Sequence, residues 1–349
     1  MTADSHTGQA GQPSLLSRTF DEPRADLDGK SILVTGGTGS FGKAFIRRVL
    51  DQYDPKRVIV FSRDELKQYE MAHELPVEKY RAMRYFIGDV RDADRLEMAM
   101  RDVDYVIHAA ALKHVSAAEY NPIECVLTNI HGAENVVKAA LRGSVKKVIA
   151  LSTDKAANPV NLYGASKLAS DKIFMAANNL AGFRGPRFSV VRYGNVIGSR
   201  GSVVPFFRDL INKGATSLPI TDPRMTRFWI TIDQGVDFVL SSLAMMRGGE
   251  VFVPRIPSMK VTDLARSMAP GLDQHVIGVR PGEKLHEVMI TEDDARTTVS
   301  LDDRYVICPS FNAQLYQDYL GSGGSALPDG FRYASDTNGE WITSLDTPF

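Results

Sequence analysis

Short apolar runs alternate with amphipathic stretches over the first 195 residues of the chain. Runs rich in Val, Ile and Phe are typical of strands buried in a parallel sheet, whereas the stretches between them have helical periodicity. Strands that alternate with helices in this way predict an α/β fold, a doubly wound parallel sheet of the Rossmann type. The predicted strands lie at 31–35, 58–61, 84–89, 103–109, 147–152 and 188–193, and the predicted helices at 43–50, 64–76 and 129–141.

The pattern loosens after Asn195, where Gly and Pro residues interrupt the chain repeatedly. Such residues are typical of loops, so this region predicts a smaller α/β lobe. Helical periodicity returns at 203–212, 232–245 and 261–268, and Val251–Val253 is a short run that could join the first sheet.

These patterns predict four segments. The first is a mobile tail, because residues 1–28 are polar and rich in Gly, Ser, Asp and Thr. The others are a nucleotide-binding lobe over 29–195, a mainly substrate-binding lobe over 196–310 that could return to the first lobe, and a C-terminal extension over 311–349.

Composition narrows the class of function. The chain has 349 residues, a net charge of -1 and 24% charged residues, so no overall field favours nucleic acid or an anionic membrane. No apolar run approaches a membrane span and no signal peptide is evident. Cys125 and Cys308 are far apart, which argues against disulfides and favours a cytoplasmic location. The seven His residues show no metal-ligand spacing, so no metal is expected.

Gly36, Gly39 and Gly42 lie between the first predicted strand and the first predicted helix. Glycines let the backbone approach a pyrophosphate, and the helix N-terminus offers it unpaired N–H groups. The spacing differs from G-x-G-x-x-G, but the strand–turn–helix context and a third strand that ends in Asp89 predict a dinucleotide cofactor.

The end of the second strand bears on which cofactor binds. Ser62, Arg63 and Asp64 follow one another there, with Lys67 close by. Arg63 and Lys67 could hold a 2′-phosphate, which favours NADP. Asp64 could instead hold the ribose diol of NAD, and Arg63 could be an ordinary surface charge, so both cofactors stay open.

The fifth strand leads into Thr153, Asp154 and Lys155, and Tyr163 and Lys167 follow. On a helix, the tyrosine and Lys167 would share one face. An ammonium beside a phenol favours phenolate, which suits a general base acting on a sugar hydroxyl. Asp154 and Lys155 could be a surface ion pair, but the end of a parallel strand favours a site. This second acid/base pair suggests a further proton transfer such as elimination.

Other charged residues are weaker candidates. Lys113, after the fourth strand, is placed to reach a substrate, whereas His108 and His114 are interpreted as packed or hydrogen-bonded residues. Guanidinium groups bind phosphate oxygens well, and a carboxylate can accept from a ribose hydroxyl, although ordinary surface charge is the alternative for each. The second-lobe candidates are Arg200, Arg224, Arg227, Arg280 and Glu283.

Several motifs together resemble a known family. They are Thr35–Gly42, Ser62–Lys67, Ala109–His114, Ser152–Asn158, Asn161–Lys167, Arg192–Val196, Pro223–Trp229 and Arg280–Glu287. The chain resembles the extended short-chain dehydrogenase/reductases and, within them, the inverting UDP-N-acetylglucosamine 4,6-dehydratases. The resemblance spans about residues 29–310. Related membrane-bound dehydratases carry Met in place of Tyr163, and dehydratases that retain the C5 configuration typically carry Glu in place of Lys155.

The resemblance implies a redox-neutral removal of water from UDP-GlcNAc, the first step of pseudaminic acid biosynthesis for flagellin glycosylation. Tyr163, supported by Lys167, would take the 4-hydroxyl proton as hydride passes to NADP⁺. A neutral Lys155 with a depressed pKa would take the C5 proton, and Asp154 would protonate the leaving 6-hydroxyl. Hydride would then return to C6 and C5 would be reprotonated from the opposite face, giving UDP-2-acetamido-2,6-dideoxy-β-L-arabino-hexos-4-ulose. A homo-oligomer is also implied.

The resemblance also implies the residues of each subsite. The catalytic set is Thr153, Asp154, Lys155, Tyr163 and Lys167. NADP would be held by Gly36, Thr38, Gly39, Ser40, Phe41, Gly42, Ser62, Arg63, Lys67, Asp89, Val90, Ala109, Tyr163, Lys167 and Val196. The UDP-sugar would be held by Lys113, Asn195, Arg200, Gly201, Ser202, Val203, Val204, Thr221, Arg280 and Glu283.

Two alternatives stay open at this point. A UDP-sugar 4- or 5-epimerase on the same scaffold would need no leaving-group acid at Asp154. A non-catalytic NADP-binding regulator would need no Tyr163/Lys167 pair.

Overall fold

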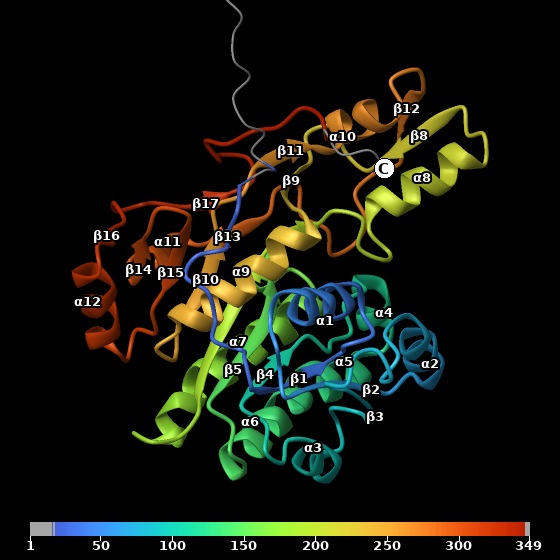
Figure 1. Ribbon diagram of the computed structural model, residues 1–349. Coiled ribbons are helices and arrows are strands. Elements are labelled where there is room, and N and C mark those ends of the chain that lie inside the picture. The colour runs from blue at the N-terminus through green and yellow to red at the C-terminus, as the bar shows by residue number, and fades with distance from the viewer. Residues whose placement is uncertain (1–15, 17, 346–349) are drawn as a thin grey trace, which may run out of the picture.

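A single twisted sheet forms the centre of the computed structural model, which describes residue 16 and residues 18–345 (Figure 1). Within that part of the chain the sheet has ten strands. In order across the sheet they are β16 (Ser325–Ala326), β14 (Thr298–Ser300), β15 (Arg304–Ile307), β10 (Val251–Pro254), β6 (Arg187–Tyr193), β5 (Lys147–Thr153), β4 (Tyr105–His108), β1 (Ser31–Thr35), β2 (Arg57–Ser62) and β3 (Met83–Ile87). The strands from β3 to β10 are parallel, and β15, β14 and β16 continue the sheet antiparallel.

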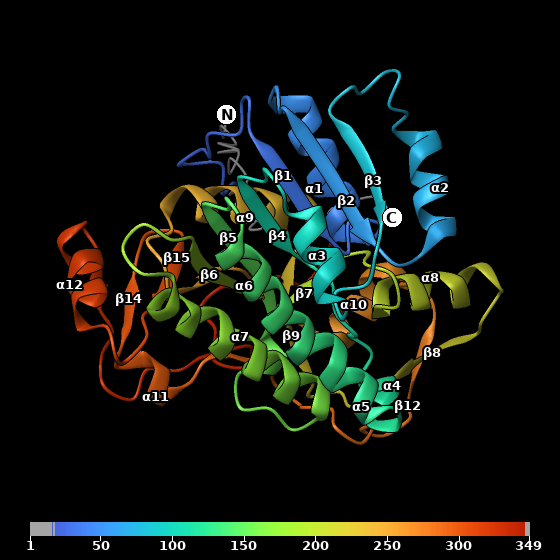
Figure 2. The same cartoon turned by 90° about the horizontal axis from the view of Figure 1, so that it is seen from below.

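Helices cover both faces of this sheet, as the strand pattern predicts. On one face lie α1 (Ser40–Gln52) and α9 (Ile232–Met245), and on the other α3 (Ala93–Ala99), α6 (Gly132–Arg142) and α7 (Leu162–Ala181) (Figure 2). Helix α1 shows why: Gly42, Phe45, Ile46 and Val49 are buried at helical spacing. They form one apolar stripe that packs on the sheet. The strands between the helices are apolar on both sides, and all five residues of β1 are buried.

The strand order β3-β2-β1-β4-β5-β6 confirms the predicted Rossmann-type fold. Each predicted strand of the first lobe lies within two residues of an observed one, and the predicted return of Val251–Val253 is confirmed by the pairing of β10 with β6. Shorter helices of this lobe are α2 (Glu65–Glu74), α4 (Val115–Tyr120) and α5 (Pro122–Val126), and a π-helical turn at Leu127–His131 joins α5 to α6.

A smaller lobe stands at the carboxyl ends of the parallel strands (Figure 1). Its own core gathers apolar side chains such as Phe207, Trp229, Met259 and Leu264. Its elements are β7 (Asn195–Val196), α8 (Val203–Asn212), β8 (Ser217–Ile220), β9 (Thr226–Ile230), β11 (Ser258–Lys260), α10 (Val261–Met268) and β12 (Asp273–Val276). Strands β7, β9 and β11 form one sheet and β8 and β12 another, so the lobe is held together by pairings that are distant in sequence.

The N-terminal segment differs from the prediction where the structure describes it. Residues 1–15 and 17 lie outside the described residues, but the prediction of a mobile tail is wrong for 18–28. Phe20 is 1% exposed and packs edge-on against Phe238, with ring centroids 5.1 Å apart. Arg18 forms an ion pair of 2.7 Å with Glu340. The prediction was based on the polar composition of the whole segment and gave no weight to the single side chains of Arg18 and Phe20, which bind it to the folded body.

The C-terminal segment also belongs to the folded body as far as residue 345. Helix α12 (Ala313–Gly321) packs near β14, and β17 (Tyr333–Ala334) pairs with β13 (Val288–Ile290). The short α11 (Glu292–Ala295) follows β13.

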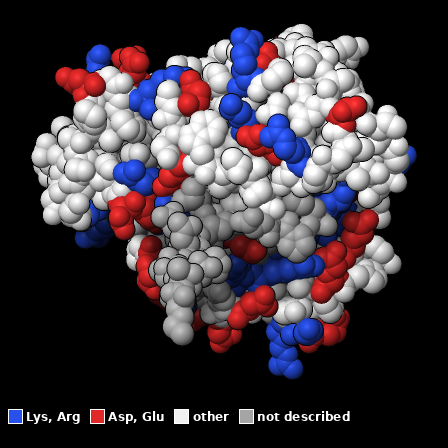
Figure 3. Space-filling model, turned by 90° about the horizontal axis from the view of Figure 1, so that it is seen from above, with Lys and Arg blue, Asp and Glu red and all other residues white. Residues whose placement is uncertain are grey.

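Viewed from above, the surface shows basic and acidic side chains interspersed (Figure 3). None of the helices within residues 18–345 is long and apolar enough to cross a lipid bilayer.

Candidate active site

A cavity of about 730 Å³ opens where the parallel strands end. Every residue expected to hold the cofactor lines it, and so do several of those expected to hold the substrate. These are Gly36, Thr38, Gly39, Ser40, Phe41, Gly42, Ser62, Arg63, Lys67, Asp89, Val90, Ala109, Tyr163, Lys167 and Val196 for the first set, and Lys113, Asn195, Arg200, Gly201 and Ser202 for the second. Thr153 and Lys155 also face the cavity.

The turn between β1 and α1 forms a cradle that only small residues allow. Gly36 has φ +66°, and a Cβ built on it would lie 2.8 Å from the backbone N of Ala110. A Cβ on Gly42 would lie 2.6 Å from Gly37 Cα, where α1 packs against the turn. No side chain caps the N-terminus of α1, so its N–H groups are open to an anion. The cradle therefore fits the pyrophosphate of a dinucleotide.

At the end of β2, Asp64 is committed to the local fold. It accepts hydrogen bonds from the backbone N of Lys67 at 3.0 Å and from its ammonium at 2.5 Å, and these bonds lower the pKa of Asp64. Asp64 is thereby the N-cap of α2, and Lys67 is partly neutralised. Arg63 also lines the cavity, with 54% of its side chain exposed, and its guanidinium lies 3.7 Å from Asp89.

The end of β5 brings three polar groups together. The Thr153 hydroxyl donates to Asp154 Oδ1 at 2.9 Å, and the Lys155 ammonium donates to the same oxygen at 3.0 Å. Asp154 is fully buried and does not itself line the cavity. Its Oδ2 has no hydrogen-bond partner, and burial raises the pKa of its carboxyl. Asp154 is therefore suited to hold a proton.

Tyr163 lies in the first turn of α7, faces the cavity and is 9% exposed. Burial raises the pKa of Tyr163 to about 12, and Lys155 and a hydrogen bond with Thr153 oppose that shift only in part. The sequence predicted that the Lys167 ammonium would favour the phenolate of Tyr163, and the structure does not show this effect. Burial outweighs the nearby charges, and the opposing cation is Lys155.

Lys167 lies one turn further along the same face of α7 and also lines the cavity. Burial lowers the pKa of Lys167, while Asp171 acts in the opposite direction. Asp171 accepts from the Ser152 hydroxyl at 2.7 Å and pairs with Arg192 at 3.3 Å. The buried ion pair of Asp171 and Arg192 thus lies next to the Tyr163/Lys167 face of α7.

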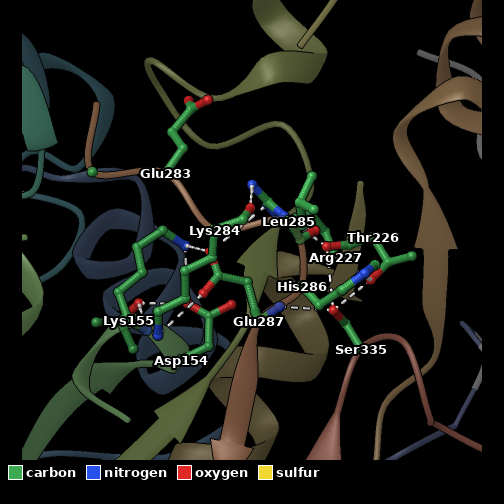
Figure 4. Close-up of polar contacts among 12 residues, drawn as sticks. Asp154, Lys155, Thr226, Arg227, Glu283, Lys284, Leu285, His286, Glu287 and Ser335 are labelled. Atoms are coloured by element: carbon green, nitrogen blue, oxygen red, sulfur yellow. Dashed lines mark hydrogen bonds and ion pairs between the residues drawn. The ribbon is translucent and has the colours of Figure 1, made fainter. Parts of the chain in front are cut away.

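Glu287 is a contact of Lys155 that the sequence analysis did not single out (Figure 4). Its Oε1 lies 3.1 Å from the Lys155 ammonium. Burial alone would lower the pKa of Lys155, but Asp154 and Glu287 outweigh burial and raise it. The expected depressed pKa of Lys155 is therefore wrong in this state. Glu287 ends a motif that the sequence analysis noted, but its partner is too distant in sequence for spacing to reveal the contact.

The other expected substrate residues lie away from the cavity lining. Val204 is buried in the core of the smaller lobe, and Val203 packs against that core. Thr221 does not line the cavity, and neither do Arg280 and Glu283, which are 3.9 Å apart.

Two further second-lobe arginines are already paired. Arg224 is bound to Asp222 at 2.8 Å, and Arg227 donates to the backbone carbonyls of Thr226, Lys284 and Leu285.

The two histidines have separate places. His108 is 1% exposed and forms a hydrogen bond of 2.8 Å with Thr35, which confirms it as a satisfied core residue. Burial lowers its pKa to about 3. His114 lines the cavity beside Gly201. No group of His, Cys, Asp and Glu that could hold a metal ion occurs among the residues described here.

Comparisons with known proteins agree with this architecture. The family model described as "Polysaccharide biosynthesis protein" matches residues 32–309. The chain is 59% identical over 325 residues to the UDP-N-acetylglucosamine 4,6-dehydratase (inverting) of Campylobacter jejuni, covering 92% of this chain and 96% of that protein. It is 41% identical over 301 residues to the UDP-glucose 4-epimerase of Rickettsia canadensis, covering 84% and 87%. The X-ray structure of Pen from Bacillus thuringiensis has a TM-score of 0.82 and 36% identity, covering 91% of this chain and 95% of that one.

Proposed function

The chain belongs to the polysaccharide biosynthesis protein family, and we propose that within this family it is an inverting UDP-N-acetylglucosamine 4,6-dehydratase. The product would be UDP-2-acetamido-2,6-dideoxy-β-L-arabino-hexos-4-ulose together with water. The observation that carries the proposal is that a phenol and an amine face the cavity together and that a buried carboxyl contacts the amine from behind the lining. They belong to Tyr163, Lys155 and Asp154.

The cofactor we propose is NADP. When bound, its nicotinamide would supply the oxidation at C4 and the later reduction at C6 that a redox-neutral dehydration requires. The glycine cradle of Gly36 and Gly42 would hold the pyrophosphate, and Arg63 would hold the 2′-phosphate. The use of Asp64 as a helix cap supports NADP over NAD, because its carboxylate already accepts two hydrogen bonds from Lys67.

The side chains divide the proton transfers between them. Tyr163 would take the proton of the 4-hydroxyl as C4 is oxidised, with Lys167 on the same helix face. A ketone at C4 acidifies the C5 proton, which the neutral amine of Lys155 would remove. Asp154 does not line the cavity in this structure, so its side chain would have to turn toward the cavity to give its proton to the leaving 6-hydroxyl. After hydride returns to C6, a solvent-derived proton would be added to C5.

One proton shift would prepare both the base and the acid. In the structure Lys155 holds its proton between two carboxylates, and its Nζ lies 3.0 Å from Asp154 Oδ1. Breaking one N–H bond of Lys155 and forming an O–H bond on Asp154 would give a neutral amine and a protonated carboxyl together. The raised pKa of the buried Asp154 favours this transfer, whereas the raised pKa of Lys155 opposes it, so the shift would have to accompany substrate binding.

The substrate would enter beside the residues that line the outer part of the cavity. Lys113 donates to the carbonyl of Arg200 at 2.7 Å, which joins the end of β4 to the loop before α8. Lys113, Asn195 and the Arg200–Ser202 segment would therefore contact the UDP-sugar. Val203, Val204, Thr221, Arg280 and Glu283 would contribute only if the smaller lobe closes over the ligand, because they do not line the cavity in this state.

The biological setting is also a proposal. The product would be the precursor of a pseudaminic acid used in flagellin glycosylation, and the enzyme would act in the cytoplasm as a homo-oligomer. Support for the cytoplasm comes from Cys125 and Cys308, which are free and buried thiols.

A UDP-sugar 4-epimerase is the second candidate, because a relative with 41% identity carries that name. An epimerase returns hydride to C4 and expels no water, so it has no use for a base at C5 or for an acid at the 6-hydroxyl. The buried Asp154 with an unpaired oxygen beside Lys155 favours the dehydratase.

Incubation of the purified protein with NADP⁺ and UDP-GlcNAc in deuterated water tests the proposal. We expect a 4-keto-6-deoxy product with deuterium at C5, detected by NMR and mass spectrometry. A product that keeps its 6-hydroxyl would indicate an epimerase, and unchanged substrate with intact NADP binding would indicate a non-catalytic binder. Either result would overturn the dehydratase assignment.

A further inference from the structure

Lys155 is held by two carboxylates that come from different parts of the chain. Asp154 is its neighbour in sequence and shares its short 3-10 helix, Asp154–Ala156. Glu287 comes from the segment that leads into β13, and its Oε1 is 3.1 Å from the Lys155 ammonium. Of these two contacts, the one with Glu287 ties the amine to a part of the chain that is distant in sequence.

The backbone of Glu287 is fixed on its own account. Its N–H donates to the Ser335 hydroxyl at 2.9 Å, and its carbonyl accepts from the Ser335 N–H at 2.8 Å (Figure 4). Thr226 on β9 and His286 extend this network through the Thr226 hydroxyl, which lies 2.7 Å from Ser335 Oγ and 2.8 Å from His286 Nδ1. The hydrogen bonds therefore fix the backbone of Glu287 independently of its contact with Lys155.

The charges around Glu287 keep it ionised. Burial acts to raise the pKa of its carboxyl, but Lys155 and Arg227 outweigh burial and lower it. Arg227 Nε lies 3.8 Å away and Lys284 Nζ 4.0 Å away. Glu287 would thus remain an anion while Asp154 changes its protonation state.

We infer that Glu287 is a positioning residue that acts through Lys155, holding its amine at the end of β5 where the amine faces the cavity. The inference rests on the proposed dehydratase function. Once Asp154 has taken a proton and turned to the 6-hydroxyl, Glu287 is the acceptor that remains for a Lys155 N–H. Glu287 does not line the cavity, so it would touch neither substrate nor cofactor.

Glu287→Gln keeps the size of the side chain and removes its charge. We expect kcat to fall about 10- to 100-fold with KM changed less than about twofold, because a misplaced amine affects the chemical step and not the hold on the nucleotide. Reduction of bound NADP⁺ on addition of UDP-GlcNAc should persist, while deuterium incorporation at C5 slows in proportion to kcat.

The pH profile provides a readout that a purely structural role would not move. The anion of Glu287 raises the pKa of Lys155, together with Asp154 and against Arg227. Lys284, His286 and Tyr163 are the other titratable groups around the pair and are unchanged in the variant. The transfer from Lys155 to Asp154 keeps one proton on the pair, so kcat should fall at alkaline pH when the pair loses that proton. Without the Glu287 anion the pKa of Lys155 is lower, so this alkaline fall of kcat should shift to lower pH in Glu287→Gln.

Four further variants complete the experiment. Glu250→Gln removes another fully buried carboxylate, which accepts from Gly248 N–H and the Tyr319 hydroxyl, and should leave the pH profile as in the unaltered enzyme. Glu287→Asp keeps the charge and should restore the position of the profile. In Lys155→Ala, adding Glu287→Gln should slow C5 exchange no further.

The outcomes separate the two claims. If the unaltered enzyme gives no 4-keto-6-deoxy product, the proposed function fails. If it does but Glu287→Gln retains its kcat and pH profile, the inference fails. It fails equally if both Glu287 variants lose folded protein in parallel with activity, since that result would assign Glu287 a structural role.

Discussion

Arg63 and Asp64 are neighbours at the end of β2 and have different roles. Asp64 is used by the chain itself as the cap of α2. Arg63 lines the cavity, and its ion pair with Asp89 is long at 3.7 Å, whereas Arg91 binds the same carboxylate at 2.7 Å. The local fold thus leaves the guanidinium of Arg63 available to a ligand and uses the carboxylate of Asp64 as a helix cap. A 2′-phosphate requires this arrangement, because it needs a cation and is repelled by a free carboxylate.

Arg63→Ala should lower the affinity for NADP⁺ about 10-fold and leave the affinity for NAD⁺ within about twofold, because a charge-assisted hydrogen bond to the 2′-phosphate is lost. Calorimetric titration with both cofactors measures this difference. Arg47→Ala is a matched control, since its side chain is also 54% exposed and lies outside the cavity. An equal loss for both cofactors would argue against a 2′-phosphate contact at Arg63.

At this scale the sequence predicted the cofactor side of the cavity lining fully, its substrate side in half of the residues, and the electrostatics of the site poorly. Gly36 directly follows β1 and Ser62 ends β2, and strand ends meet at one edge of a parallel sheet. The pKa directions of Tyr163 and Lys155 depend on burial and on partners such as Glu287. Those contacts exist only after folding, so no spacing rule indicates them.

Helix α7 carries the Tyr163/Lys167 face, and its first turn is fixed by Asn161. The side chain of Asn161 accepts from the Gly164 N–H at 2.7 Å and donates to the Gly282 carbonyl at 2.7 Å. One residue therefore caps the helix and ties it to the segment that leads to Glu287.

Asn161→Ala should lower the free energy of unfolding by about 1 kcal/mol, the usual cost of losing an N-cap. Urea denaturation followed by circular dichroism measures the change. Asn161→Ser is the comparison, because serine can cap the helix but is too short to bridge to Gly282 in the same way, so it should be the more stable of the two variants. If the alanine and serine variants are equally stable, the cap contributes little here.

Elements of the first lobe were predictable because they are local: apolar runs of strand length alternate with helical periodicity. The strands of the smaller lobe were not. Strand β9 pairs with β11 and β7, and β8 pairs with β12, across long separations in sequence. All five residues of β9 are buried, and a short buried run of that kind does not reveal its partner.

Across the whole molecule, the two ends of the described chain secure both lobes. Phe20 packs on Phe238 of α9, and Arg18 reaches Glu340. Strand β16 extends the large sheet, while a bridge from Trp341 joins Ser258 of the smaller lobe.

Phe20→Ala should lower the free energy of unfolding by about 3–5 kcal/mol, the usual cost of removing a fully buried ring. Arg18→Ala should cost less than about 1 kcal/mol, because its ion pair is partly exposed to solvent. Chemical denaturation of both variants tests the contrast. A Phe20→Ala protein as stable as the Arg18→Ala protein would mean that the N-terminal segment contributes little to the folded state.

The chain passes between the lobes several times, which limits how relatives with different substrates could be recombined. The large sheet takes strands from 31–193, 251–254 and 298–326, and the smaller lobe takes its elements from 195–230 and 258–276. A chimera of two relatives that exchanged only one contiguous segment would therefore build the smaller lobe partly from one relative and partly from the other. A transplant of substrate preference would require at least two separate inserts, each matched to the strands it must join.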